Sequence, residues 1–338
     1  MEARILKALR CSEYTGIPLL LALTISFVAG SPLDAEDWPM FGGDIRRSNV
    51  SIEKLKFDRL ALAWQWGSVQ PPLPAWGKPA KGDAFANLRD FASMRNYDPT
   101  FHPIVVGDAV YFASNVDDSV RCLDLATGET RWLFIAGGPI RIAPTFDEGR
   151  IYFGADDGFA YCLDANDGKL VCQFSPTADE QGRKVLNHGR LISFWPCRTG
   201  VLVDQGTAYF GCSLLPWKTS YLCAVDAESG KLLGEGRYVR ELLNITLEGP
   251  LVAGNELLYA PQGREAPLQL QRADGKHLGT LKDGFGAFCV LTPANHLLHG
   301  PRKKGGGIVD SDALTRSPVA THKAARLMIV SEKFSLMQ

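Results

Sequence analysis

The feature of this sequence that most constrains its fold is a motif that occurs twice. The segments "RCLDLATGETRW" (121–132) and "YCLDANDGKLVC" (161–172) share Cys-Leu-Asp, a polar turn that ends in Gly, and an apolar strand. Their Asp and Gly positions lie 40 residues apart. A fixed period of this length is the signature of repeat architectures, in which neighbouring units bury one continuous core. The motif therefore predicts a repeat protein built from short strands.

Each repeat reads as four short strands. In the first unit the strand-forming segments are 102–108, 109–115, 119–128 and 129–136. A second unit follows directly, a third follows after an insertion and ends with "KLLGEG" (231–236), and a fourth and a fifth are weaker. Four strands in about 40 residues is the format of a propeller blade. The sequence therefore predicts an all-β β-propeller of four-stranded antiparallel blades, with about five to six blades present.

The turns between the third and fourth strands share one chemistry. In "LDLATG", "LDANDG" and "VDAESG" the Asp can accept hydrogen bonds from backbone amides ahead of it, and the Gly allows the positive φ that closes the turn. A metal site is not indicated, because each Asp lies on a different blade. We interpret three pairs as structural turns: Asp124 with Gly128, Asp164 with Gly168, and Asp226 with Gly230. Trp132, in the strand after the first turn, is predicted to pack between neighbouring blades.

The repeat resembles that of a known family. The run "CLDLATGETRW … GGPIRIAPTF … RIYFGADDGFAYCLDANDGK" is similar to the repeat of the pyrroloquinoline-quinone-type β-propellers, the quinoprotein alcohol dehydrogenase-like superfamily. The opening "DWPMFGGDIRRSN" (37–49) is similar to the mature start of many such exported bacterial proteins. The resemblance is strong over 101–175 and fair to about 235. It implies a propeller that often has eight blades.

The two ends of the repeat region do not complete a blade. The segment "LALAWQWG" (60–67) reads as the last strand of a blade whose other strands have not yet appeared. The segment "ARLMIVSEKFSLMQ" (325–338) reads as the first strands of a further blade. Compared with an eight-bladed ring, the repeats are therefore expected to be incomplete. Three explanations stay open: a truncated chain, which we favour, a smaller ring closed in another way, or a ring completed by a partner chain.

The first thirty residues predict an export signal. A basic stretch precedes an apolar run that is too short for a comfortable bilayer span, and Val28 and Gly30 suit a cleavage site. The predicted organisation is a signal peptide (1–30), an N-terminal segment with the closing-blade strand and a Pro-rich insert (31–100), and propeller repeats (101–338). We expect a periplasmic or extracellular protein without a transmembrane span after signal removal. The net charge of −1 gives no reason to expect nucleic acid as a partner.

Seven cysteines remain after signal removal, and disulfides persist in exported proteins. Their wide scatter over a large domain is not typical of a disulfide scaffold, and an odd number leaves at least one thiol unpaired within the chain. We interpret most of them as buried thiols in strands, where Cys behaves as a small hydrophobic side chain.

The resemblance also implies a chemistry for which the sequence lacks the groups. A quinoprotein dehydrogenase would hold its quinone between a tryptophan and a disulfide of adjacent cysteines, with calcium nearby. The sequence contains no Cys-Cys pair, no convincing acidic and Asn cluster for calcium, and no Cys-x-x-Cys-His haem motif. His296 and His299 would lie on opposite faces of a strand. We therefore assign no catalytic residue, metal or cofactor, and pyrroloquinoline quinone and calcium belong only to the alternative function.

The most informative segment outside the repeat is the insert "PTADEQGRKVLNHGRLISFWPCRTG" (176–200). Long inserts on propellers lie where ligands and partners dock, and Arg clustered with an aromatic residue suits an anionic ligand or a protein hot spot. The candidate binding residues are Arg183, Lys184, His188, Arg190, Trp195 and Arg198. The alternative is a solvated loop whose Trp packs on the neighbouring blade.

Together these features favour a non-catalytic exported propeller that serves as a binding or scaffold module for a protein or small-ligand partner in the cell envelope. The nearest functional analogy is the propeller component of the outer-membrane protein assembly machinery, and this analogy is one of fold. The alternative is a quinone-dependent dehydrogenase or a truncated remnant of one. A third hypothesis is a nonfunctional truncated product.

Overall fold

The structure places most of the chain from residue 36 onward. The computed structural model describes residues 36–53, 61–72, 100–180, 182–187, 189–263, 265–286, 288–300, 307–323, 328–330 and 335–337. The chain divides into two units, Met1–Ala35 and Glu36–Gln338, and all the described elements belong to the second. The predicted signal peptide and much of the predicted N-terminal segment lie outside the described residues.

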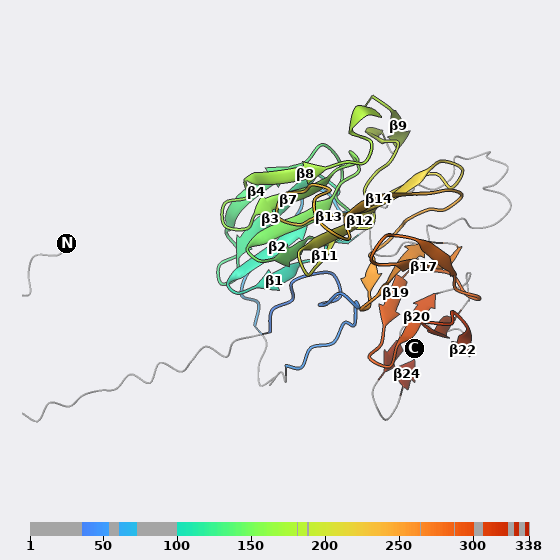
Figure 1. Cartoon of the computed structure of the whole chain (residues 1–338). Helices are drawn as coiled ribbons and strands as arrows, with labels where there is room; N and C mark the ends of the chain where they lie inside the picture. The colour runs from blue at the N-terminus through green and yellow to red at the C-terminus, as the bar shows by residue number, and fades with distance from the viewer. Residues whose placement is uncertain are drawn as a thin grey trace, which may run out of the picture. The chain divides into compact units, whose positions relative to one another are not determined.

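Five four-stranded antiparallel sheets follow one another along the chain, and each takes its strands in sequence order (Figure 1). Blade 1 contains β1 (Ile104–Val106), β2 (Ala109–Ala113), β3 (Ser119–Asp124) and β4 (Thr130–Ile135). Blade 2 contains β5 (Thr145–Asp147), β6 (Arg150–Gly154), β7 (Ala160–Asp164) and β8 (Leu170–Phe174). Blade 3 contains β11 (Leu202–Asp204), β12 (Thr207–Cys212), β13 (Ser220–Asp226) and β14 (Tyr238–Leu242).

The last two blades have the same plan. Blade 4 contains β15 (Val252–Ala253), β16 (Leu257–Gln262), β17 (Glu265–Gln271) and β18 (His277–Thr280). Blade 5 contains β19 (Phe288–Leu291), β20 (His296–Gly300), β21 (Ile308–Asp312) and β22 (Pro318–His322). The prediction of an all-β propeller with four-stranded antiparallel blades is confirmed.

Two hairpins stand outside the four-stranded sheets. Between blades 2 and 3, the 3-10 helix η1 (Ala178–Glu180) precedes β9 (Lys184–Asn187), which pairs with β10 (Arg190–Ser193). After blade 5, β23 (Met328–Val330) pairs with β24 (Ser335–Met337), so the segment predicted to begin a further blade contains two paired strands. Within the described residues we find no helix with the length and hydrophobicity needed to cross a membrane.

The core of each blade lies in its middle strands. All six residues of β12 are buried, and the same holds for all five of β2. The fourth strands are far more exposed, since four of the six residues of β4 and three of the five residues of β8 are exposed. This gradient arises because the middle strands contact the neighbouring blades on both faces, whereas each fourth strand lies at a sheet edge.

One strand prediction is wrong. The segment 231–236 was expected to form the fourth strand of blade 3. That strand is instead β14, which begins at Tyr238, after the predicted segment has ended. Gly234 and Gly236 both have positive φ, +93° and +72°, so the backbone between them cannot continue as a strand. The described part of the predicted strand 60–67 has no strand partner among the described residues.

The turn between the third and fourth strands has the same geometry in successive blades. The Asp124 Oδ1 accepts hydrogen bonds from the backbone N–H groups of Ala126 (3.0 Å) and Thr127 (2.9 Å). Gly128, with φ +73°, donates its N–H to the Asp124 carbonyl over 2.8 Å. The corresponding bonds in blades 2 and 3 are Asn166 N–H to Asp164 Oδ1 and Ser229 N–H to Asp226 Oδ1.

Blades 1 and 2 meet where a large side chain of blade 1 packs on the turn glycine of blade 2. Trp132 is 8% exposed, and its Nε1–H donates to the Ala165 carbonyl over 2.9 Å. Its ring lies so close to Gly168 that a Cβ built there would be 2.6 Å from the indole Cε3. Glycine is therefore needed at position 168 for two reasons: its φ is positive, and the indole leaves no space for a Cβ.

Residues 61–67 supply the same contact to blade 1. Trp64 donates its Nε1–H to the Leu125 carbonyl over 2.8 Å, and a Cβ on Gly128 would lie 2.6 Å from its Cδ2. Trp132 makes the same two contacts with Ala165 and Gly168 in blade 2. The segment therefore covers blade 1 as a fourth strand would, although it joins no sheet within the described residues.

Residues 36–49 connect the first strands of four blades. Trp38 pairs with Val105 in blade 1, through hydrogen bonds of 2.7 and 3.1 Å. Three further carbonyls accept from first-strand amides: Pro39 O from Phe146 N, Ile45 O from Ala253 N, and Arg46 O from Leu291 N. This segment therefore connects blades 1, 2, 4 and 5 through the backbone.

Candidate functional site

The insert between blades 2 and 3 contains the six predicted binding residues. Its β9–β10 hairpin is antiparallel, with Leu186 opposite Leu191 and Lys184 opposite Ser193. After the hairpin, the backbone runs against the β6–β7 loop, where Ser193 N–H donates to the Asp156 carbonyl (2.7 Å) and Cys197 N–H donates to the Ala155 carbonyl (3.0 Å). The base of the insert is therefore joined to blade 2 by main-chain hydrogen bonds.

Arg198 is a buried structural cation. Its side chain is 1% exposed, and its Nε and Nη2 each donate to one oxygen of Asp156 over 2.8 Å. Arg141, from the link between blades 1 and 2, donates its Nε to the same carboxylate over 2.8 Å. Burial acts to raise the pKa of Asp156, but the two guanidinium charges outweigh it and hold that pKa below its ordinary value.

Arg190 fixes the hairpin to blade 1. Its guanidinium hydrogen bonds to Asp118 and to the Val116 carbonyl, both in the β2–β3 loop. Burial raises the pKa of Asp118, and the Arg190 charge opposes that rise. Because Arg190 contacts blade 1 and Arg198 contacts blade 2, the insert is held from two blades at once.

Trp195 is a buried anchor. It is 5% exposed, donates its Nε1–H to the Thr219 carbonyl over 2.9 Å, and meets Phe194 and Tyr221 edge-on with ring centroids 5.2 and 6.2 Å apart. The Arg183 guanidinium lies 5.8 Å from the centre of the Trp195 ring, within the range of a cation–π contact. Trp195 thus packs on blade 3, as the alternative interpretation of the insert expected.

The remaining predicted residues divide by exposure. Arg183 and Lys184 are exposed to solvent, and His188 lies outside the described residues. The five described candidates therefore fall into two groups. Arg190, Trp195 and Arg198 hold the insert in place, while Arg183 and Lys184 remain at its surface.

Sequence reasoning missed the apolar face of the hairpin and the acid beneath it. Leu186 and Leu191 are 69% and 65% exposed, opposite each other on adjacent strands. The segment "KVLNHGRLIS", with an apolar pair on each side of a polar stretch that contains Gly, was a usable signal for a two-stranded hairpin. Asp156 had no such signal, because "GADDGF" reads as an ordinary polar turn and its two Arg partners are distant in sequence.

The described residues bear on the calcium ion that the resemblance implies. They contain no group of three or more His, Cys, Asp or Glu side chains that could hold a metal ion. Asp156, the most deeply buried acid near the insert, is already occupied by two Arg side chains. His296 bonds to Asp310, whereas His299 is buried and bonds to Ser311, so the two rings have separate partners. We derive no step that passes through a quinone or calcium.

Comparison with known proteins assigns the family. A family model described as outer membrane protein assembly factor BamB matches residues 65–237, just over half of the chain. The chain belongs to this family. The BamB family match covers blades 1 and 2, the insert, and blade 3 up to the start of β14.

Relatives of this BamB family member include quinone enzymes. The dehydrogenase subunit of a quinone alcohol dehydrogenase from Gluconobacter oxydans is 30% identical over 230 residues, which are 62% of this chain and 25% of that protein. The corresponding subunit from Komagataeibacter europaeus is 28% identical over 145 residues, 38% of this chain and 18% of that protein. The chain thus spans a quarter or less of the length of these relatives.

Solved structures of quinoproteins share the fold. A europium-containing methanol dehydrogenase superposes with a TM-score of 0.57 at 14% identity, covering 85% of this chain and 58% of the enzyme. A quinohemoprotein alcohol dehydrogenase from Comamonas testosteroni gives 0.52 at 17% identity, covering 82% and 47%. The resemblance to quinoprotein-type propellers is confirmed, and at these identities it concerns the fold.

Proposed function

We propose that this protein is a non-catalytic exported β-propeller that binds a partner protein in the cell envelope through its β9–β10 hairpin. The observation that carries the proposal is the pair of leucines at the surface of that hairpin. Leu186 and Leu191 are about two-thirds exposed and lie directly opposite each other. Covering such a pair would contribute about 1.5 kcal/mol or more for each side chain.

The way in which the hairpin is held supports a binding role. Arg190, Trp195 and Arg198 fix its base to three blades. A surface element that is already ordered loses little conformational freedom when a partner docks, so more of the contact energy remains for affinity. Arg183 and Lys184 beside the leucines favour a partner surface with acidic groups around an apolar centre.

The family supports the setting of the proposal. Its model is described as an outer membrane protein assembly factor, and that description favours a protein as the partner. Together with the predicted export signal, this favours the periplasm as the location. Binding of a partner protein by the hairpin requires no resident cofactor or metal. A small ligand is the alternative occupant of this surface if no protein binds there.

Site-directed photocrosslinking in cells tests the proposal. A photoreactive amino acid replaces Leu191, and a matched control replaces Val319, which is 58% exposed on β22 of blade 5. We expect one discrete protein adduct from position 191 and none from position 319, and the serine variant Leu186→Ser should weaken the adduct. Adducts of equal yield from both positions, or from neither, would contradict a binding hairpin.

Quinone-dependent alcohol oxidation is the second candidate function, and the 30% identity to the Gluconobacter oxydans subunit favours it. The described residues lack a metal-binding cluster, which weighs against it. Incubating the purified protein with pyrroloquinoline quinone and calcium, followed by a dye-linked assay with primary alcohols, separates the two candidates. Alcohol-dependent dye reduction above that of free quinone would replace the binding proposal with an enzymatic one.

A further inference from the structure

Blade 2 departs from the blade 1 pattern at the position that contacts the next blade. In blade 1, Cys122 on β3 lies opposite Trp132 on β4. In blade 2, Cys162 on β7 lies opposite Cys172 on β8. The contact with the next turn glycine changes accordingly, because a Cβ on Gly230 would meet the Cys172 sulfur at 2.8 Å rather than an indole ring. Two facing thiols therefore stand where blade 1 has one thiol and a tryptophan.

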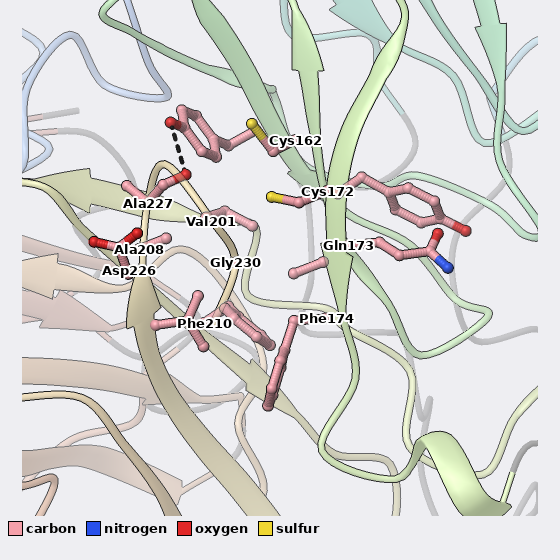
Figure 2. A pocket seen from close by; sticks show the side chains of 14 residues that line it. Cys162, Cys172, Gln173, Phe174, Val201, Ala208, Phe210, Asp226, Ala227 and Gly230 are labelled. Carbon is pink, nitrogen blue, oxygen red and sulfur yellow. Dashed lines mark hydrogen bonds between the residues drawn. The ribbon is translucent and has the colours of Figure 1, made fainter. Parts of the chain in front are cut away.

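A small cavity surrounds the pair. It measures about 20 Å³, enough for one water molecule, and lies between blades 2 and 3. Figure 2 shows the two sulfur atoms next to each other, with Ala227 and Gly230 across the cavity. The loss of the indole thus leaves free space beside the sulfur atoms, and each side chain has room to change rotamer.

The backbone of the pair suits a disulfide. Residues directly opposite in an antiparallel sheet have Cα atoms about 4.5 to 5.5 Å apart, within the range of about 4.4 to 6.8 Å that disulfides span. Cys162 and Cys172 are such a pair in the register of β7 and β8. Their backbone separation therefore falls in the class that a cross-strand disulfide can span.

The surroundings of the pair favour a reactive thiolate. The hydrogen bond from Cys172 and the neighbouring Arg150 guanidinium together lower the pKa of Cys162 to about 7, against the effect of burial. Cys162 is buried, whereas Cys172, whose own pKa is raised by the contact with Cys162 and by burial, lies on the fourth strand and is half-buried. The thiolate that can attack a disulfide is thus favoured at Cys162, and the side of the pair nearer to solvent is Cys172.

A second pair in the same protein provides a comparison. Cys197 and Cys212 also lie directly opposite each other, but both are fully buried. Burial raises the pKa of Cys197, and that of Cys212 is also raised. Cys197 and Cys212 therefore face each other across a β-bridge as Cys162 and Cys172 do across two strands, but neither side chain is exposed and neither thiol has a lowered pKa.

We propose that Cys162 and Cys172 form a thiol–disulfide exchange site that a small-molecule disulfide oxidises to a cross-strand bond between β7 and β8. A thiolate of the pair attacks one sulfur of the small disulfide and expels the other sulfur as a thiolate. The second cysteine gives its proton to a released thiolate and displaces the bound thiol. Two electrons pass from the cysteine pair to the small disulfide, which leaves as two thiols. The inference does not depend on the binding role of the hairpin.

Peptide mapping after exposure to glutathione disulfide tests the site. The reduced, folded protein is incubated at neutral pH, quenched with acid, alkylated and cut with trypsin. Cys162 and Cys172 then lie in separate peptides, 151–169 and 170–183, and so do Cys197 and Cys212, in 191–198 and 199–218. We expect the first two peptides to become linked, with Cys197 and Cys212 still alkylated. Alkylation of all four residues after long incubation would overturn the proposal.

Variants separate a reactive site from mere proximity. Arg150→Gln should slow the linkage roughly fivefold at neutral pH, because fewer thiolates form. Arg240→Gln, which removes a similarly exposed Arg on β14, should leave the rate unchanged. Cys172→Ser should leave a glutathione adduct on Cys162 in place of the link. Equal rates in both Arg variants, or linkage of Cys197 to Cys212 at the rate of the first pair, would refute a tuned exchange site.

Discussion

Gly168 shows how strongly a single turn residue can be constrained. It has φ +70°, and a Cβ at this position would lie 2.6 Å from the Trp132 ring. Gly149 has a similar φ of +76° but no atom within 4 Å of such a Cβ. Gly149→Ala should therefore lower the free energy of unfolding by about 1 kcal/mol from backbone strain, and Gly168→Ala by about 3 kcal/mol, because the clash adds to it. Urea denaturation measures both, and equal losses would show that the indole contact is loose.

Asp156 makes stability depend on pH in a defined direction. Its folded pKa lies below the ordinary value of 3.8, so its ion pairs stabilise the protein fully above that pH and lose their contribution as the pH falls through the folded value. Asp156→Asn should cost about 3 to 5 kcal/mol at neutral pH, because two buried Arg side chains lose their carboxylate.

The control for this prediction is an exposed acid. Asp274 is 48% exposed, and its carboxylate lies 3.8 Å from the Arg240 guanidinium. Asp274→Asn should lower the free energy of unfolding by no more than about 1 kcal/mol. Urea titrations of the three proteins at descending pH measure the differences. The difference in free energy of unfolding between wild type and Asp156→Asn should become smaller below pH 3.8. A difference that stays constant would contradict the assignment of Asp156 to a buried ion pair.

At the residue scale, the sequence predicted what is local and missed what is distant. The turn pairs such as Asp124 and Gly128 lie four residues apart, so their chemistry is visible in a short window. The partners of Asp156 are 15 and 42 residues away, and only the fold brings them together.

At the scale of elements, the β9–β10 hairpin depends on one ion pair for its contact with blade 1. Arg190→Ala removes the hydrogen bonds to Asp118 and Val116. Amide hydrogen exchange in β9 and β10 should become faster, while the melting temperature changes little, because the core of the blades is untouched. Lys184→Ala, on the paired strand and exposed, is the matched control and should leave exchange unchanged. Unchanged exchange in both variants would show that the contacts of the insert with blades 2 and 3 are enough to hold the hairpin.

Strand placement succeeded wherever the four-strand period was uninterrupted. In blade 3 the period is lengthened by the two glycines at 234 and 236, and β14 therefore begins at Tyr238, after the predicted segment ends. The ring of Tyr238 still reaches the next turn, 2.4 Å from a Cβ built on Gly275, as Trp132 does at Gly168. The contact between blades is thus preserved while the loop length varies.

At the scale of the whole molecule, contacts between the N-terminal segment and the blades could not be predicted from the sequence. Arg47 donates its Nε–H to the Leu251 carbonyl, 204 residues away, over 2.9 Å. It is 3% exposed and also donates from Nη1 to the Phe41 carbonyl over 2.8 Å. "DWPMFGGDIRRSN" was useful as a family signature, but no local pattern indicated that its backbone would bond to four blades.

Arg47→Ala should therefore affect several blades at once. It leaves the buried carbonyl of Leu251 and the partly buried carbonyl of Phe41 without this donor, at a total cost of about 1 to 3 kcal/mol. It also loosens the segment that bonds to Phe146 and Leu291. Hydrogen exchange should rise together in β5, β15 and β19. Arg46→Ala removes a single partly buried bond to the Thr292 carbonyl and should cost about 1 kcal/mol or less, with faster exchange confined to blade 5. If Arg47→Ala raised amide hydrogen exchange in blade 4 alone, the blades would be stable independently of one another. Residues 36–49 would then lie on the blades without connecting them.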